Sequence, residues 1–265
     1  SKIEASLKLS AIGDALGRMT EFQRNSDDLV NQFGIERIER FYDWEKMVGG
    51  RYYGFIDAIK AGSYSDDTQL TLSIARSIMP DGSMDNIRFS KLELSNWLYY
   101  ARGGGRTIKN AASKIQRKSA SWNNNFFQFK VGKQTINYRD SGANGAAMRV
   151  LPIALANIGN IKKIKSEIFS NAIITHGHAR AIIGAMTYGA IIDSLFPYSS
   201  SDFDPFDFLT EFGKSFKDRL SLDVQQNDEL MQWVKNWENG WPIDFETHYN
   251  DIVEEVHHQL QNIFI

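Results

Sequence analysis

The 265-residue chain contains no cysteine, which excludes disulfide bonds and thiolate metal sites. It has only five prolines, and this suits a largely helical fold because helix interiors reject proline. No apolar run approaches the roughly 20 residues that a membrane span requires, and no signal-peptide pattern opens the chain. Neither sign of charge dominates: 30 basic and 32 acidic side chains give a net charge of −2, with no electrostatic case for binding a membrane or nucleic acid. We therefore expect a cytoplasmic protein.

The chain is long and apolar enough to bury a sizeable core, since 42% of its residues are hydrophobic and 12% aromatic. No linker, repeat or low-complexity segment divides it. The most loop-like stretch, residues 199–202, is expected to join two helices. We predict a single domain over residues 1–265.

Apolar residues recur at helical spacing through most of the chain. These stripes predict helices within residues 3–16, 70–78, 92–100, 164–168, 182–191, 208–220 and 252–260. Pro80 is expected to end the second helix, and the glycines from Gly103 to Gly105 the third. Residues 126–138 instead resemble two short strands around Gly132, which predicts a small β-hairpin inserted among the helices. The predicted fold class is all-α.

The segment Ser65-Asp66-Asp67-Thr68 concentrates oxygen ligands at the start of an apolar helical stretch. Carboxylate and hydroxyl oxygens suit a hard cation such as Mg²⁺ or Mn²⁺, whereas zinc prefers His or Cys. The same residues also make good helix caps, because they accept hydrogen bonds from unpaired N–H groups. Both interpretations remain open from this segment alone.

A second acidic segment, Gly13-Asp14-Ala15-Leu16-Gly17, is followed by Glu21. Two glycines inside a helix weaken it, so close packing or an approaching ligand is expected there. Asp14 and Glu21 are seven residues apart and would share one helix face if the helix continued that far.

Two later segments have ligand-binding potential. Residues 141–149 form a loop of small residues that runs into an apolar helical stretch over 150–156, where backbone N–H groups could converge on a diphosphate. This loop is neither a Walker loop nor a dinucleotide fingerprint, and it could also be a simple tight turn. Thr175-His176-Gly177-His178 lies at a helix junction, where a capping threonine beside one hydrogen-bonded histidine is the simpler interpretation.

The order and spacing of these four segments resemble the ADP-ribosylglycohydrolase family, and the match covers roughly residues 1–195. The resemblance implies a compact orthogonal all-α bundle with a dinuclear Mg²⁺ or Mn²⁺ centre. It also implies a metal-dependent hydrolase that removes ADP-ribose from a modified protein side chain or another acceptor.

The resemblance assigns roles to eleven residues of this sequence. It implies that Ser65, Asp66 and Asp67 hold metal, and that Glu21 acts with Asp66 and Asp67 in catalysis. It also implies that the substrate is bound by Ser141, Gly142, Asn144, Gly145 and His176. Asp14 would support the site, and Arg149 would anchor its helix or neutralise a carboxylate.

The family also has a second metal motif, Gly-Asp-x-Asp-Thr/Ser, that does not occur in this sequence. The nearest pattern, Asp202-Phe203-Asp204, precedes Pro205 and is interpreted as the start of a helix. The sequence is therefore expected to be incomplete at its carboxyl end relative to the family. The alternatives are a site completed by a partner chain, or a non-catalytic module that binds ADP-ribose or a nucleotide.

Overall fold

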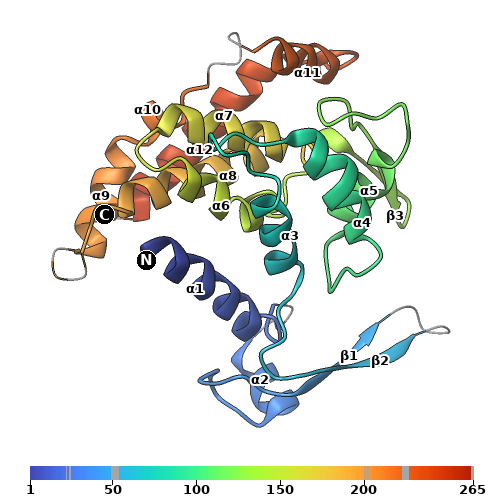
Figure 1. Cartoon of the computed structure of the whole chain (residues 1–265), viewed down its shortest axis with the longest axis vertical. Helices are drawn as coiled ribbons and strands as arrows, with labels where there is room; N and C mark the ends of the chain where they lie inside the picture. The colour runs from blue at the N-terminus through green and yellow to red at the C-terminus, as the bar shows by residue number, and fades with distance from the viewer. Residues whose placement is uncertain are drawn as a thin grey trace. The chain divides into compact units, whose positions relative to one another are not determined.

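The computed structural model describes residues 1–265 except Phe22, Arg24, 49–53, Ser200, Asp202, 223–226 and 264–265. Its elements divide into two compact units (Figure 1). Unit 1 comprises residues 1–69 and 101–103, and unit 2 comprises residues 70–100 and 104–265. Among the described residues, no helix is long and apolar enough to cross a membrane.

Unit 1 contains two helices, one hairpin and the beginning of a third helix. The elements are α1 (Lys2–Gly17), α2 (Ser26–Phe33), β1 (Trp44–Val48), β2 (Phe55–Ile59) and the first turn of α3 (Asp66–Ala75). The strands β1 and β2 pair antiparallel, with Trp44 opposite Ile59. The helical spacing within residues 3–16 predicts α1, whereas no pattern in the sequence predicts this hairpin.

Unit 2 is mainly helical. Its α-helices after α3 are α4 (Ser95–Trp97), α5 (Arg106–Ile115), α6 (Leu151–Ala156), α7 (Ile161–Ala172), α8 (Ala179–Leu195), α9 (Pro205–Lys214), α10 (Phe216–Leu220), α11 (Asp228–Glu238) and α12 (Phe245–Ile263). The remaining elements are the π-helix η1 (Arg88–Leu94), the strands β3 (Gln128–Val131) and β4 (Gln134–Asn137), and the 3-10 helices η2 (Tyr138–Asp140) and η3 (Ala147–Arg149). The all-α fold is confirmed, and so is the hairpin predicted over residues 126–138, because β3 pairs antiparallel with β4.

The core of unit 2 forms where α7 packs along α8, beside α6 and α12 (Figure 1). Ile164, Ile168 and Phe169 of α7 are fully buried, as are Ile182 and Met186 of α8. Their burial explains the helical stripes in the sequence, because each stripe is the face that its helix removes from water.

An aromatic cluster packs α11 and α12 against α7. The ring of Trp233 meets Phe169 edge-on, with ring centroids 5.5 Å apart, and lies 4.8 Å from Phe245. The indole N–H groups also have partners: Trp233 donates to the hydroxyl of Tyr138 (3.0 Å) and Trp237 to the carbonyl of Gly177 (2.7 Å). This cluster therefore holds the side chain of Tyr138, shortly before the loop of residues 141–149, and the backbone of Gly177 within the segment 175–178.

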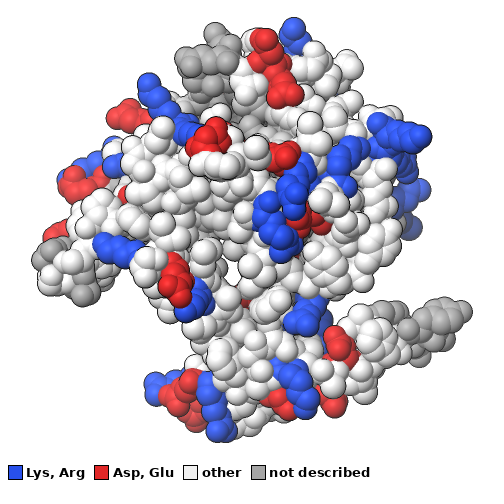
Figure 2. All heavy atoms as spheres, viewed as in Figure 1, with Lys and Arg blue, Asp and Glu red and all other residues white. Residues whose placement is uncertain are grey.

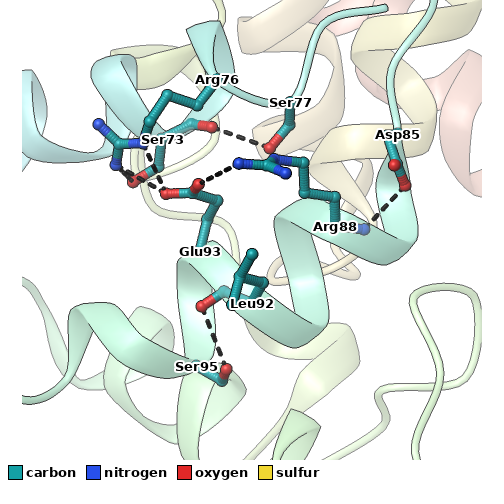
Figure 3. Close-up of polar contacts among 8 residues, drawn as sticks. All are labelled: Ser73, Arg76, Ser77, Asp85, Arg88, Leu92, Glu93 and Ser95. Carbon is teal, nitrogen blue, oxygen red and sulfur yellow. Dashed lines mark hydrogen bonds and ion pairs between the residues drawn. The ribbon is translucent and has the colours of Figure 1, made fainter.

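A buried carboxylate holds η1 in place (Figure 3). Glu93 is 8% exposed and accepts hydrogen bonds from Arg76, at 2.9 Å from Nε and 2.6 Å from a terminal nitrogen. Arg88 lies 3.5 Å from its other oxygen. The predicted helix over residues 92–100 is therefore correct in location, but its first part is the π-helix and α4 ends at Trp97.

Two further predictions were wrong in detail, and the condition for a shared face of Asp14 and Glu21 is not met. The helix predicted through Ile78 ends at Ala75, and Ile78 pairs with Met84 in an isolated β-bridge. The stripe over residues 208–220 is divided between α9 and α10 at Ser215. Helix α1 ends at Gly17, so it does not carry Asp14 and Glu21 on one face.

Asp204 begins a helix, as predicted. It is the N-cap of α9, and its carboxylate accepts from the backbone N–H groups of Phe206 (2.8 Å) and Asp207 (3.0 Å). Asp202 lies outside the described residues, as does Ser200 of the predicted loop over 199–202.

Candidate active site

The acidic motif of unit 1 forms the first turn of α3. Asp66 and Asp67 are its first two residues, and the hydroxyl of Ser65 accepts from the backbone N–H of Asp67 (3.3 Å). The helix-cap interpretation is therefore correct for Ser65. It does not exclude a cation site, because the acceptor in this cap is the hydroxyl of Ser65.

Asp14 holds this turn from α1. One of its oxygens accepts from the hydroxyl of Ser65 (2.6 Å). The other accepts from the backbone N–H groups of Ser65 (2.9 Å) and Thr68 (3.0 Å) and from the hydroxyl of Thr68 (2.6 Å). With this many donors, Asp14 positions the start of α3 and is poorly placed to bind a metal itself.

Negative charge is concentrated in this part of unit 1. The pKa of Asp67 is raised to about 7, first by burial and then by the nearby carboxylates of Asp66, Asp14 and Glu21. The pKa of Glu21 is also raised, first by burial and then by Asp66. Glu21 is thus brought into the same electrostatic cluster as Asp66 and Asp67, although α1 ends before it.

Two neighbours of the cluster were not anticipated from the sequence. Arg18 is 8% exposed and donates to the carbonyl of Tyr64 (2.8 Å), which brings a positive charge close to Asp14 and Asp66. Gly103 has a φ of 134°, and a Cβ atom at this position would clash with Oδ1 of Asp66. Only the position of Gly103 in a triple glycine marked it in the sequence, where it was interpreted as a helix end.

The donor set fits a hard divalent cation in its chemistry. Asp66 is 7% exposed and Ser65 is 5% exposed, so the available ligands are oxygen atoms largely shielded from water. Burial, and then repulsion from nearby carboxylates, raise the pKa of Asp67, and a bound cation would relieve that repulsion. Among the described residues, no group of three or more His, Cys, Asp or Glu side chains is arranged to hold a metal ion. The metal assignment of Ser65, Asp66 and Asp67 stays a prediction.

The loop of residues 141–145 in unit 2 follows η2 directly. Ser141 is buried and its N–H donates to the carbonyl of Tyr138 (3.1 Å), while the N–H of Gly142 donates to that of Asp140 (3.0 Å). The backbone N–H groups of Ala143, Asn144 and Gly145 have no acceptor among the residues that the structure describes. Consecutive unpaired N–H groups of this kind are the feature with which a loop binds an anion.

His176 lies against this loop from the buried side. It is fully buried, and a Cβ atom on Gly145 would lie 2.9 Å from its Cε1 atom. Its Nδ1 atom is 2.7 Å from the hydroxyl of Thr175, whereas its Nε2 atom has no hydrogen-bond partner among the described residues. Burial, and then the charge of Arg149, lower the pKa of His176 to about 3, so its imidazole is neutral at pH 7.

Arg149 connects the loop to the helix junction. It is fully buried and donates to the carbonyl of Gly145 (2.8 Å), to the side-chain oxygen of Asn171 (2.8 Å) and to the hydroxyl of Thr175 (2.9 Å). It also donates to the carbonyl of Asn171 (2.9 Å). All four acceptors are neutral, and burial lowers the pKa of Arg149 to about 9. Arg149 therefore anchors the loop through hydrogen bonds, and it pairs with no carboxylate in the part of the chain that the structure describes.

The predicted site residues thus fall into two groups. Glu21, Ser65, Asp66 and Asp67 lie together in unit 1, and Ser141, Gly142, Asn144, Gly145 and His176 lie together in unit 2.

Comparison with known proteins identifies the family. The family model described as ADP-ribosylglycohydrolase matches residues 1–262. The chain is 29% identical over 187 residues to the ADP-ribosyl-[dinitrogen reductase] glycohydrolase of Rhodospirillum rubrum, covering 70% of this chain and 54% of that protein. It is 23% identical over 209 residues to the ADP-ribosylarginine hydrolase Tri1 of Serratia proteamaculans, covering 76% and 49%. The chain spans about half the length of the curated relatives that it matches. Since the family model extends over nearly all of its residues, the chain belongs to the ADP-ribosylglycohydrolase family.

Proposed function

We propose that this protein hydrolyses the bond between ADP-ribose and a side chain of a modified protein. The observation that carries the proposal is the carboxylate cluster of unit 1, where burial and then the neighbouring charge of Asp66 raise the pKa of both Asp67 and Glu21, in a chain of the ADP-ribosylglycohydrolase family. The names of the two relatives, which describe removal of ADP-ribose from dinitrogen reductase and from arginine, support the choice of a modified protein as substrate.

The proposed chemistry suits these residue types. Breaking a ribosyl bond creates positive oxocarbenium character at the sugar, and nearby carboxylates stabilise that charge. Glu21 would position the attacking water and accept its proton, a task for which a raised pKa is an advantage. The displaced acceptor leaves as the water oxygen bonds to the ribose.

Ser65, Asp66 and Asp67 would hold Mg²⁺ or Mn²⁺ through their oxygen atoms. A divalent cation, when bound, supplies positive charge that orients the ribose hydroxyls and makes a water more acidic. Asp14 would keep the two aspartates in place through its hydrogen bonds to the start of α3. The unpaired N–H groups of loop 141–145 would bind the diphosphate of ADP-ribose.

The test is release of free ADP-ribose from ADP-ribosylated arginine and serine peptides, measured with Mg²⁺, with Mn²⁺ and with chelator. We expect release to require a cation and to fall at least about a hundredfold in Asp66→Asn and Asp67→Asn. Asp218→Asn, on the exposed surface of α10, is the matched control and should retain full activity.

Two results would contradict the proposal. Undiminished, cation-independent release by Asp66→Asn would remove the metal assignment. ADP-ribose binding by calorimetry without release from any substrate would indicate a binding module or a site that a partner chain completes.

A further inference from the structure

One segment of unit 2 has a charge composition unlike the rest of the chain. Residues 104–139 contain no Asp or Glu, although the chain as a whole carries 32 acidic against 30 basic side chains. The basic residues of this segment are Arg106, Lys109, Lys114, Arg117, Lys118, Lys130, Lys133 and Arg139. The small net charge of the chain therefore conceals a strongly basic region.

Six of these side chains are exposed and have no charged partner. Arg106, Lys109, Arg117, Lys118, Lys130 and Lys133 are exposed, and none forms an ion pair with a residue that the structure describes. We call these six residues the basic surface. Some exposed bases elsewhere in unit 2 do pair with carboxylates, as Lys217 does with Glu254 (2.5 Å).

The remaining two basic residues, Arg139 and Lys114, are not fully exposed. Arg139 donates to the carbonyls of Trp237 (2.5 Å), Asn236 (3.1 Å) and Asn239 (3.1 Å) at the end of α11. Lys114 is half-buried. The first acidic residue after the segment, Asp140, accepts from the backbone N–H of Asn137 (3.0 Å) at the beginning of η2. Asp140 therefore forms no ion pair with any of the six residues of the basic surface.

Helix α5 places part of the basic surface next to the loop of residues 141–145, for which we propose diphosphate binding. Its buried face consists of Ile108, Ala111, Ala112 and Ile115. The Cδ1 atom of Ile108 lies 2.5 Å from the position of a Cβ atom on Gly145, so this face packs directly on the loop. Arg106 and Lys109 are exposed on the same helix, one turn apart.

The end of α5 and the following hairpin extend the basic surface. Lys91 holds the segment after α5 by donating to the carbonyls of Ile115 (2.7 Å), Arg117 (3.0 Å) and Ala120 (2.6 Å). Lys130 lies on β3, Lys133 lies in the turn, and β4 leads through η2 into Ser141. Figure 2 shows Lys and Arg side chains gathered at the right edge of the view, over the part of unit 2 that carries α5 and β3 in Figure 1.

We propose that the basic surface binds an acidic stretch of the substrate protein close to its ADP-ribosylated side chain. This inference rests on the proposed function, because it makes the surface beside loop 141–145 responsible for the choice of protein substrate. Unpaired cations that border an anion-binding loop would attract an acidic substrate over a distance of about a Debye length and raise its rate of association. The six side chains would therefore select among modified proteins by the charge around the modification.

An acidic protein fits this surface better than a single-stranded nucleic acid does. Binding of single strands without sequence preference uses exposed aromatic rings on which bases stack. The aromatic residues of 104–139 are Trp122, Phe126, Phe127, Phe129 and Tyr138, and each is buried or half-buried. Residues 104–139 themselves therefore offer charge without an exposed ring on which a base could stack.

The experiment compares three substrates that carry the same ADP-ribosylated arginine: a peptide with four flanking Asp residues, a peptide with four flanking Asn residues, and free ADP-ribosylarginine. The variants are Arg106→Glu/Lys109→Glu and Lys130→Glu/Lys133→Glu. The matched control is Lys162→Glu/Lys235→Glu, which reverses two exposed bases of α7 and α11. Thermal unfolding of each variant checks its fold, and Lys→Gln and Arg→Gln versions replace any variant that is destabilised.

We expect kcat/KM for the Asp-flanked peptide to fall at least about tenfold in both variants, through KM, and to fall in wild type as salt is raised. For the Asn-flanked peptide and free ADP-ribosylarginine, kcat/KM should change neither with these substitutions nor with salt. The control variant should match wild type on all three substrates. Equal losses on all three substrates, or no preference for the Asp-flanked peptide in wild type, would overturn the inference.

A binding measurement separates this inference from the proposed function. Fluorescence anisotropy with labelled, unmodified Asp-rich and Asn-rich peptides requires no turnover, so it reports on the basic surface even if no substrate is hydrolysed. A labelled single-stranded RNA is the third probe. If wild type binds the Asp-rich peptide and both variants do not, the inference is supported. If the substitutions weaken binding of the RNA but not of the Asp-rich peptide, the basic surface has a nucleic-acid partner and the inference is wrong.

Discussion

At the scale of single residues, the candidate site of unit 1 depends on Asp14, a carboxylate that is already hydrogen-bonded within the protein. The side-chain oxygens of Asp14 accept from Ser65 and Thr68 through two backbone N–H groups and two hydroxyls. The resemblance to the family gave Asp14 only a supporting role, and the structure explains how that support works. Because Asp14 fixes the beginning of α3, it also fixes the neighbouring Asp66 and Asp67.

We predict that Asp14→Asn lowers the free energy of unfolding by about 1–3 kcal/mol, because one acceptor oxygen becomes an amide nitrogen that faces donors. Urea denaturation monitored by circular dichroism measures the change. Glu4→Gln is the control on the same helix, where an exposed side chain should change stability by less than about 0.5 kcal/mol. Equal stability of Asp14→Asn and wild type would show that these hydrogen bonds contribute little.

Arg149 is the corresponding residue in unit 2. We predict that Arg149→Met lowers the free energy of unfolding by about 3 kcal/mol or more, because the buried acceptors at Gly145, Asn171 and Thr175 lose their donor. The hydrogen-bonded N–H groups of Ser141 and Gly142 should also exchange with solvent faster than they do in wild type. Arg117→Met, at an exposed position, is the control for stability. A loss below about 1 kcal/mol would contradict the anchoring role.

At the scale of elements, the sequence predicts what each helix buries more reliably than where each helix ends. The apolar stripes of α7 and α8 could be recognised in the sequence because these faces form the core of unit 2. The β1–β2 hairpin was not predicted: Met47, Phe55 and Ile56 are exposed, so its strands lack the alternation of a half-buried sheet. The π-helical turn of η1 has no sequence signature that distinguishes it from an α-helix.

The same limit applies to the candidate site. Ser65, Asp66 and Asp67 are adjacent in sequence, so their motif could be recognised from the sequence. Gly103 meets Asp66 only because the chain returns to it, and this proximity of residues far apart in sequence depends on the tertiary fold.

We predict that Gly103→Ala lowers both stability and turnover, because the added methyl group clashes with Asp66 and the residue must keep a φ of 134°. Gly159→Ala is the matched control: its φ is also positive, at 84°, but a Cβ atom there would meet nothing within 4 Å. The control should lose about 1 kcal/mol from backbone strain alone. Gly103→Ala should lose more, measured by urea denaturation, and should weaken ADP-ribose release. Equal effects of the two substitutions would show that the contact with Asp66 is unimportant.

At the scale of the whole molecule, burial makes stability depend on pH. His176 has a pKa of about 3 in the folded protein, against an ordinary value of 6.5. Between these values the unfolded chain binds more protons than the folded one, so the free energy of unfolding falls as pH falls. Burial also lowers the pKa values of His178 and His248, which act in the same direction. Acid therefore destabilises the folded protein, because the unfolded chain can protonate these histidines more easily than the folded protein can.

We predict that His176→Asn removes part of this dependence. The asparagine retains a polar atom near Thr175 but no longer titrates, so its cost at pH 7 comes from lost packing alone. As pH falls from 6.5 to 5, wild type should lose about 2 kcal/mol through His176, and the stability gap between the two proteins should narrow by that amount. Urea denaturation at pH 7, 6 and 5 measures the gap. A gap that stays constant would mean that the folded protein can protonate His176 without penalty, which its complete burial beside Arg149 argues against.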